Sequence, residues 1–209
     1  MIIHYGFDEP DSFEVKKAYY SHRPKTWDWQ GEWASQSPLN VVYQAFEGGG
    51  AQDTPGYLAL PGAHADQFYV ETTPVWKRPR ETHDLRNTRT TFYLKAISPI
   101  LTEPGYAPHL FIADVVFLDD IEYRHNITGW FVRKPLDIGP EWTFNTVDLQ
   151  NDEAMWTCYG GPHSLDKVLG GTGFIGVMYL RGIEYRGVNA RGVLGLDEFR
   201  YNIPLDGRP

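Results

Sequence analysis

Short apolar segments, each bounded by glycine or proline, recur along the chain and constrain its fold more than any other feature. They are rich in the β-branched and aromatic residues that fit a pleated strand, and the clearest ten span residues 1–7, 40–46, 56–60, 67–72, 89–97, 109–118, 129–136, 142–149, 173–180 and 192–201. The separators, such as EGGG, LPG, YGGP and LGGTG, are typical turn sequences. Short strands at this spacing predict an all-β sandwich or barrel, not βαβ units.

Helical periodicity is weak, and only two stretches favour a helix. Residues 13–20 predict one or two helical turns, and residues 163–171 predict another, with Ser164 as its N-cap and Gly170 beyond its end. No linker or internal repeat divides the 209 residues, which suit a single domain spanning 1–209. Within it, residues 19–38 predict a long loop that holds Trp27, Trp29 and Trp33.

The chain is acidic, with a formal net charge of −8. A nucleic-acid-binding protein is expected to show a basic stripe, so no nucleic-acid partner is predicted. No apolar run approaches the ~18 residues of a membrane span, and the first residues lack the features of a secretory signal. We therefore expect a chain made in the cytoplasm with no membrane partner. Cys158 is the single cysteine, which rules out a disulfide within the chain.

The last apolar segment contains an acidic pair, Asp197 and Glu198, inside an otherwise strand-like run. Side chains of an extended strand alternate between its two faces, which predicts that Asp197 shares the face of Phe199. If that face is the core, the carboxylate needs a hydrogen-bonding partner or a metal, because an unpaired buried charge is expensive.

The two ends of the chain resemble non-catalytic carbohydrate-binding modules of the galactose-binding-like jelly-roll fold. The matching residues are Phe7, Asp8 and Glu9 near the start and the run 196–199 near the end, and residues 138–156 are similar to a central strand of such modules. The resemblance implies a single jelly-roll β-sandwich of two antiparallel sheets, with one or two short helical turns and adjacent first and last strands. It also implies a clip through one structural Ca²⁺ held by Asp8 and Asp197. The alternative is that Asp197 accepts backbone hydrogen bonds or pairs with an arginine.

Tryptophans are the candidate ligand-binding residues, because an aromatic ring offers a broad apolar face and suits an amphipathic ligand such as a sugar. The candidates are Trp27, Trp29, Trp33, Trp76 and Trp130. Trp142 and Trp156, inside or next to predicted strands, are expected in the core.

Two charged or polar clusters in the sequence are candidates for other roles. One is a cluster of four arginines in an otherwise acidic chain: Arg78, Arg80, Arg86 and Arg89. It forms either a solvated loop or a docking patch for an acidic partner. His163, Ser164 and Asp166 lie too close in sequence to form a nucleophile–base–acid triad, which is normally assembled from distant segments. No enzyme activity and no zinc site are predicted.

These expectations combine into a non-enzymatic structural or adhesion protein of a bacteriophage particle, either a capsid decoration or a tail-associated protein. Its partners would be other virion proteins or further copies of itself, with weak binding to cell-surface glycan in addition. It would be made in the host cytoplasm and act in the virion. The alternative is a carbohydrate-binding module of a secreted polysaccharide-active enzyme, which would act outside the cell.

Overall fold

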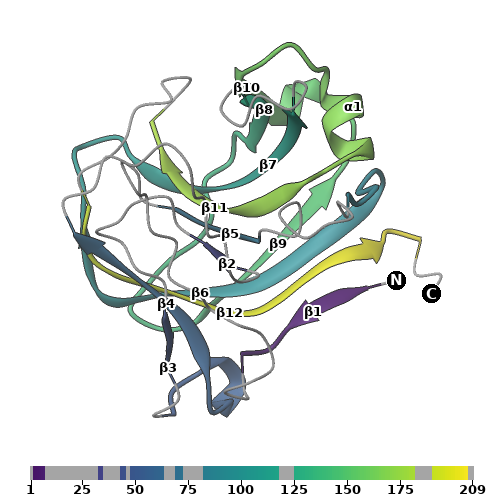
Figure 1. Cartoon of the computed structure of the whole chain (residues 1–209). Coiled ribbons are helices and arrows are strands. Elements are labelled where there is room, and N and C mark those ends of the chain that lie inside the picture. The colour runs from purple at the N-terminus through teal and green to yellow at the C-terminus, as the bar shows by residue number, and fades with distance from the viewer. Residues whose placement is uncertain are drawn as a thin grey trace.

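Two antiparallel sheets stacked face to face make up the molecule (Figure 1). The computed structural model describes residues 2–7, 33–34, 43–45, 48–63, 69–72, 82–117, 125–181 and 190–206. In the first sheet, the strand order is β3 (Tyr43–Ala45), β4 (Tyr57–Ala63), β12 (Arg191–Pro204), β6 (Thr88–Leu101) and β9 (Thr143–Leu149), and β1 (Ile3–Tyr5) also pairs with β12. In the second sheet the order is β10 (Trp156–Gly160), β8 (His125–Val132), β7 (Ala107–Phe117), β11 (Phe174–Leu180), β5 (Tyr69–Thr72) and β2 (Trp33–Ala34). The predicted all-β sandwich is confirmed.

The main core fills the space between the two sheets. Phe92 of β6 stacks on Phe199 of β12 with ring centroids 5.3 Å apart. Trp156 is fully buried, and its indole N–H donates to the Gln150 carbonyl at 3.1 Å, so its single polar atom is satisfied. The predicted core position of Trp156 is confirmed.

A second apolar cluster lies on the other face of the second sheet. Leu110 and Ile112 of β7 point into the main core, whereas Phe111 and Ala113 belong to this second cluster. All seven residues of β11 are buried as well. Strands covered on both faces read as continuous apolar runs, which explains why the segments 109–118 and 173–180 show no polar alternation.

The helices are short. The helix α1 (Leu165–Gly170) is capped by Ser164, whose hydroxyl accepts the Lys167 N–H at 3.4 Å, so the predicted turn and its N-cap are confirmed. Gly170 was predicted to lie beyond the end of the helix, but it is the last helical residue and Gly171 is the C-cap. Two 3₁₀ turns, η1 (Ala51–Asp53) and η3 (Glu153–Met155), complete the described helices. The predicted turn at 13–20 lies outside the described residues. Within the described part of the chain, no helix combines the length and apolarity needed to cross a membrane.

All ten predicted segments contain a strand, and the first and last strands are neighbours as predicted. Ile3 pairs with Tyr201, His4 with Arg200 and Tyr5 with Phe199. Two strands were missed: β10, and β2, which has only two residues inside the predicted long loop and pairs with β5.

Candidate functional site

A β-bulge in β12 decides which way Asp197 faces. Asp197 pairs with Tyr93 of β6, and Arg200 pairs with Thr91, so three steps on β12 match two steps on β6. Glu198 lies at this bulge and adopts a left-handed backbone with φ 49°. Because of the extra residue, Leu196 and Phe199 both join the main core, while Asp197 lies opposite the outward-facing Tyr93. The predicted alternation, with Asp197 on the face of Phe199, is therefore wrong.

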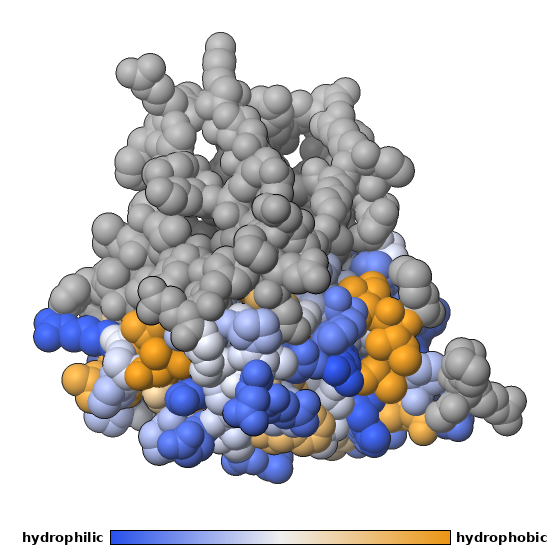
Figure 2. All heavy atoms as spheres, turned by 90° about the horizontal axis from the view of Figure 1, so that it is seen from below, coloured by the Kyte–Doolittle hydropathy of each residue, from blue (hydrophilic) through white to orange (hydrophobic). Residues whose placement is uncertain are grey.

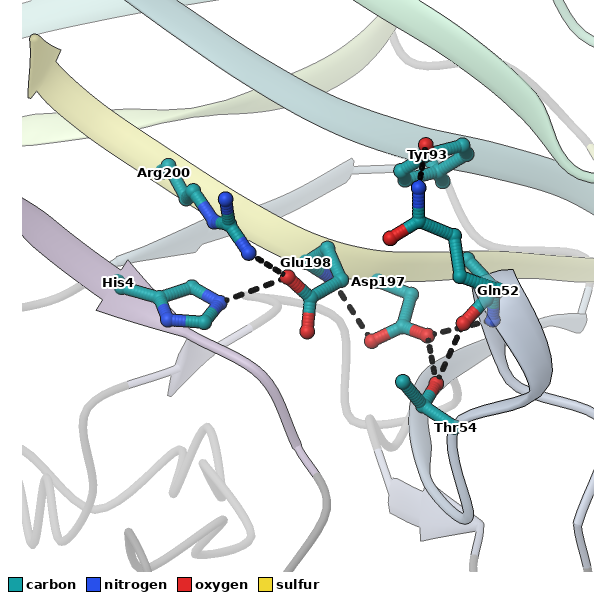
Figure 3. A network of polar contacts seen from close by, with 8 residues as sticks. His4, Gln52, Thr54, Tyr93, Asp197, Glu198 and Arg200 are labelled. Carbon is teal, nitrogen blue, oxygen red and sulfur yellow. Dashed lines mark hydrogen bonds and ion pairs between the residues drawn. The ribbon is translucent and has the colours of Figure 1, made fainter.

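Asp197 is nevertheless fully buried, because the loop 48–54 folds over it (Figure 3). Its Oδ2 accepts the Ala51 N–H at 2.7 Å and lies 2.9 Å from Thr54 Oγ1, and its Oδ1 accepts the Glu198 N–H at 2.8 Å. Burial raises the pKa of the Asp197 carboxyl to about 7, although these three hydrogen bonds favour the charged form. The hydrogen-bonding alternative describes how this carboxylate is held.

The calcium clip stays a prediction, because its other ligand, Asp8, lies outside the described residues. Among the residues that are described, no three or more histidine, cysteine, aspartate or glutamate side chains gather in a way that could hold a metal ion.

The loop 48–54 has a tightly turned backbone. Gln52 and Asp53 both have positive φ, 54° and 63°. A Cβ on Gly50 would lie 2.5 Å from the Gly56 carbonyl oxygen, closer than side-chain carbons approach, so only glycine fits there. The glycine run EGGG, which predicts a turn, is what lets this loop fold back onto the sheet.

The same loop holds two aromatic side chains of the outer face. Gln52 donates its amide N–H to the Tyr93 hydroxyl at 2.7 Å, and the Trp142 indole N–H donates to the Gly49 carbonyl at 2.7 Å. Asp197 therefore anchors the loop, and the loop fixes the positions of Tyr93 and Trp142.

Four aromatic side chains form what we call the aromatic band: Phe144, Tyr93, Trp142 and Tyr57. Phe144 of β9 is 53% exposed and pairs across the strands with Tyr93 of β6, with ring centroids 5.1 Å apart. The Trp142 ring contacts Tyr57 of β4 edge-on, with centroids 5.5 Å apart.

Gly195 shows where the Trp142 ring lies. A Cβ on Gly195 of β12 would come within 2.9 Å of the Trp142 ring, so the indole lies directly over this strand. The aromatic band thus places one ring on or above each of four neighbouring strands: β9, β6, β12 and β4. Trp142 is partly exposed in this position, so its predicted core location is wrong.

Two cationic side chains on the same sheet face as the aromatic band are matched by opposite charges. The Lys95 ammonium lies 5.8 Å from the centre of the Trp142 ring and 4.0 Å from a Glu141 carboxylate oxygen. Arg89 donates two hydrogen bonds to Asp148 at 2.6 and 3.2 Å. Seen from the side of β1, β3 and β12, the described surface shows apolar patches interspersed with hydrophilic side chains (Figure 2).

Glu198, at the bulge, contacts one residue of β1 and one of β12 (Figure 3). Its carboxylate contacts the His4 ring nitrogen at 3.0 Å and the Arg200 guanidinium. This contact ties β1 to β12 where the first and last strands meet.

A separate polar cluster lies beside α1. His163 Nδ1 is 2.9 Å from Asp114, and His163 Nε2 is 3.2 Å from the Lys167 ammonium. Ser164 is used as the helix cap, and Asp166 accepts a hydrogen bond from Asn151. The structure therefore pairs His163 with Asp114 and does not align His163, Ser164 and Asp166 as a triad.

The predicted ligand-binding tryptophans have diverse positions. Trp27, Trp29 and Trp76 lie outside the described residues, and of Trp33 only the backbone, in β2, is described. Trp130 packs against the main core, and its indole N–H donates to the His163 carbonyl at 3.3 Å.

Of the predicted docking arginines, Arg78 and Arg80 lie outside the described residues. Arg86 and Arg89 are described, and both are paired with carboxylates. Arg86 contacts Asp84 at 2.6 Å and Asp166 at 3.7 Å, and Arg89 contacts Asp148 as above.

Sequence reasoning missed Phe144, Tyr93 and Tyr57, although one signal was present. Phe144 alternates with Thr146 and Asp148 along β9, whereas Asn145, Val147 and Leu149 are buried. An aromatic residue in register with polar ones indicates a ring that faces solvent.

No protein-family model and no curated protein sequence matches the chain. An exo-β-agarase structure is similar at 11% identity and a TM-score of 0.43, over 79% of this chain and 23% of the agarase chain. The CBM22-1 and GH10 modules of xylanase 10B from Clostridium thermocellum, complexed with xylohexaose, are similar at 10% identity and a TM-score of 0.41, over 81% of this chain and 26% of the xylanase chain.

A third similar structure is the K2 cleaved adhesin domain of Lys-gingipain, at 9% identity and a TM-score of 0.41, over 97% of this chain and 100% of the adhesin domain. The chain spans about a quarter of the length of the agarase and xylanase chains. Its assignment as a β-sandwich rests on its own strand pairing.

Proposed function

We propose that the protein binds carbohydrate non-covalently through the aromatic band and has no catalytic role at this site. The observation that carries this proposal is Phe144, a large apolar ring that is 53% exposed beside Tyr93 on a hydrogen-bonded sheet. An exposed aromatic face offers apolar contact to the C–H face of a sugar ring, while nearby polar groups can bond its hydroxyls.

The polar groups needed for such a ligand border the aromatic band. Gln52 is exposed and fixed by its bond to Tyr93, and the Lys95 ammonium, with three N–H donors, lies over the Trp142 ring. A surface of fixed rings and fixed donors binds with little loss of side-chain freedom.

This proposal corresponds to the carbohydrate-binding alternative of the sequence analysis. The bacteriophage-particle interpretation rests on the sequence alone, and no contact of the described residues favours it.

The test is native affinity electrophoresis of the wild-type chain in gels containing xylan, mixed-linkage β-glucan, galactomannan or agarose. We expect at least one polymer to retard the wild type, and Phe144→Ala to weaken that retardation. An aromatic contact contributes about 0.5–1.5 kcal/mol, so the dissociation constant should rise by roughly two- to tenfold.

The control variant is Leu101→Ala, which removes another exposed apolar side chain, 63% exposed, from the far end of β6. It should bind like the wild type. The proposal is refuted if no polymer retards the wild type, or if Leu101→Ala weakens binding as much as Phe144→Ala does.

A further inference from the structure

We infer that the ligand of the aromatic band is a neutral polysaccharide chain, bound over several consecutive sugar units that cross the strands of the first sheet. This inference rests on the proposed function and adds to it the length, direction and charge of the ligand.

The length and direction come from the positions of the four rings. Phe144 belongs to β9 and Tyr93 to β6, the Trp142 ring lies over Gly195 of β12, and Tyr57 begins β4. Neighbouring strands lie about 4.8 Å apart, so four strands place the outermost rings roughly 14 Å apart. A single sugar ring cannot contact both ends of such a row, whereas an oligosaccharide can.

The row runs across the strands because of their register. Tyr93 pairs with Phe144 on one side and with Asp197 on the other, and Leu196 pairs with Leu58, which follows Tyr57. Asp197 therefore occupies the position in this row that would otherwise carry an exposed side chain. Its burial under the loop brings Gln52 and Gly49 to the row in its place.

The described residues around the band carry no net positive charge, which argues for a neutral ligand. The described cations on or near it each have a carboxylate beside them: Lys95 has Glu141, Arg200 has Glu198 and Arg89 has Asp148. Asp53 adds an exposed acidic side chain in the loop, and the whole chain carries a formal net charge of −8. A uronate or sulfate group would meet net repulsion here, while hydroxyl groups would not.

Lys95 is the side chain best placed to bond a sugar hydroxyl in the middle of the row. It lies two residues from Tyr93 on the same face of β6, and its ammonium is 5.8 Å from the centre of the Trp142 ring. Lys95→Met keeps the length of the apolar stem and removes the donor, so it separates hydrogen bonding from packing.

The experiment is calorimetric titration of the wild type with the monosaccharide, disaccharide, trisaccharide and hexasaccharide of whichever polymer binds in the electrophoretic screen. Polygalacturonate is the anionic comparison, tested at low and high salt. We expect affinity to rise steeply with chain length and polygalacturonate to bind more weakly than the neutral polymer at both salt concentrations. Phe144→Ala and Lys95→Met should each weaken hexasaccharide binding several-fold.

The outcomes separate the two proposals. If no neutral or anionic polymer binds, the proposed function fails. If a polymer binds but its monosaccharide binds as tightly as its hexasaccharide, or if polygalacturonate binds more tightly at low salt, carbohydrate binding survives and the inference of a long neutral ligand is overturned. Normal hexasaccharide binding by both variants would also overturn it.

Discussion

Asp197→Asn is the substitution that tests how the loop 48–54 is held. The two side chains have nearly the same shape, but the amide places an N–H group where the carboxylate has an oxygen. In either orientation this group faces a backbone donor, Ala51 N–H on one side or Glu198 N–H on the other. The wild-type acid avoids this conflict when it is protonated. Its proton can be donated to Thr54 Oγ1, which in turn donates to the Ala51 carbonyl at 2.8 Å.

The size of the effect depends on pH, because the folded-state pKa of Asp197, about 7, lies above the ordinary aspartate value of 3.8. Between these two values the folded state binds more protons than the unfolded state, so stability falls as pH rises from about 4 to about 7 and then levels off. A shift of this size corresponds to at most about 4 kcal/mol. The carboxylate lies beneath a single covering loop, so screening by the nearby solvent reduces that figure.

The asparagine variant loses this titration and leaves one buried donor unpaired. We expect it to be less stable than the wild type by about 1–3 kcal/mol at about pH 5, where the wild-type acid is protonated and all its partners are satisfied. At about pH 8.5 the wild type carries the buried charge, so the difference should shrink by at least about 1 kcal/mol.

The assay is urea unfolding of both proteins, followed by tryptophan fluorescence and circular dichroism at each pH. Comparing the two proteins cancels the titration of all other groups, which they share. A stability difference that is equal at both pH values, or larger at the higher pH, would refute a raised pKa and would instead indicate a carboxylate stabilised in its charged form.

Three further predictions concern the band, the core and the predicted calcium. Gly195→Ala should displace the Trp142 ring, because the added Cβ would lie 2.9 Å from that ring. We expect weaker retardation by the polysaccharide with an unchanged far-ultraviolet circular dichroism spectrum. Retained binding would contradict the placement of the ring. Phe92→Ala removes a fully buried ring from the main core and should lower the free energy of unfolding by about 3–5 kcal/mol, measured by urea unfolding; a loss below about 1 kcal/mol would contradict its burial. EDTA should leave Tm unchanged, because both Asp197 oxygens already accept hydrogen bonds from the chain; a fall in Tm that Asp197→Ala abolishes would support the calcium clip with Asp8.

The strands could be predicted from the sequence because their signals are local. Apolar segments between glycine and proline mark where each strand begins and ends, and Ser164 marks the start of α1. The pairing of the first and last strands was predicted from a resemblance at the two chain ends. The strand β2 was missed because two residues carry no periodicity, and β10 because its five residues, WTCYG, do not alternate regularly between apolar and polar side chains.

The site could be predicted only in part, because it depends on register. Trp142 was expected in the core since it adjoins an apolar strand, but its ring lies over Gly195, a position 53 residues later in the chain. No local pattern reports that a glycine on one strand leaves room for a tryptophan from another. Phe144 did have a local signal, its alternation with polar residues along β9.

The bulge at Glu198 connects the fold to the candidate site. If β12 alternated regularly through residues 196–199, Asp197 and Phe199 would share one face and Leu196 the other, so the main core would either lose a large apolar side chain or take in Asp197 without the donors it now has. With the bulge, Leu196 and Phe199 both stay in the core, and Asp197 turns to the outer face to bind the loop 48–54. That loop then fixes Tyr93 through Gln52 and Trp142 through Gly49. The bulge in the last strand thus keeps Leu196 and Phe199 in the core while it turns Asp197 outward, and through the loop 48–54 it positions two of the four rings that we propose bind the ligand.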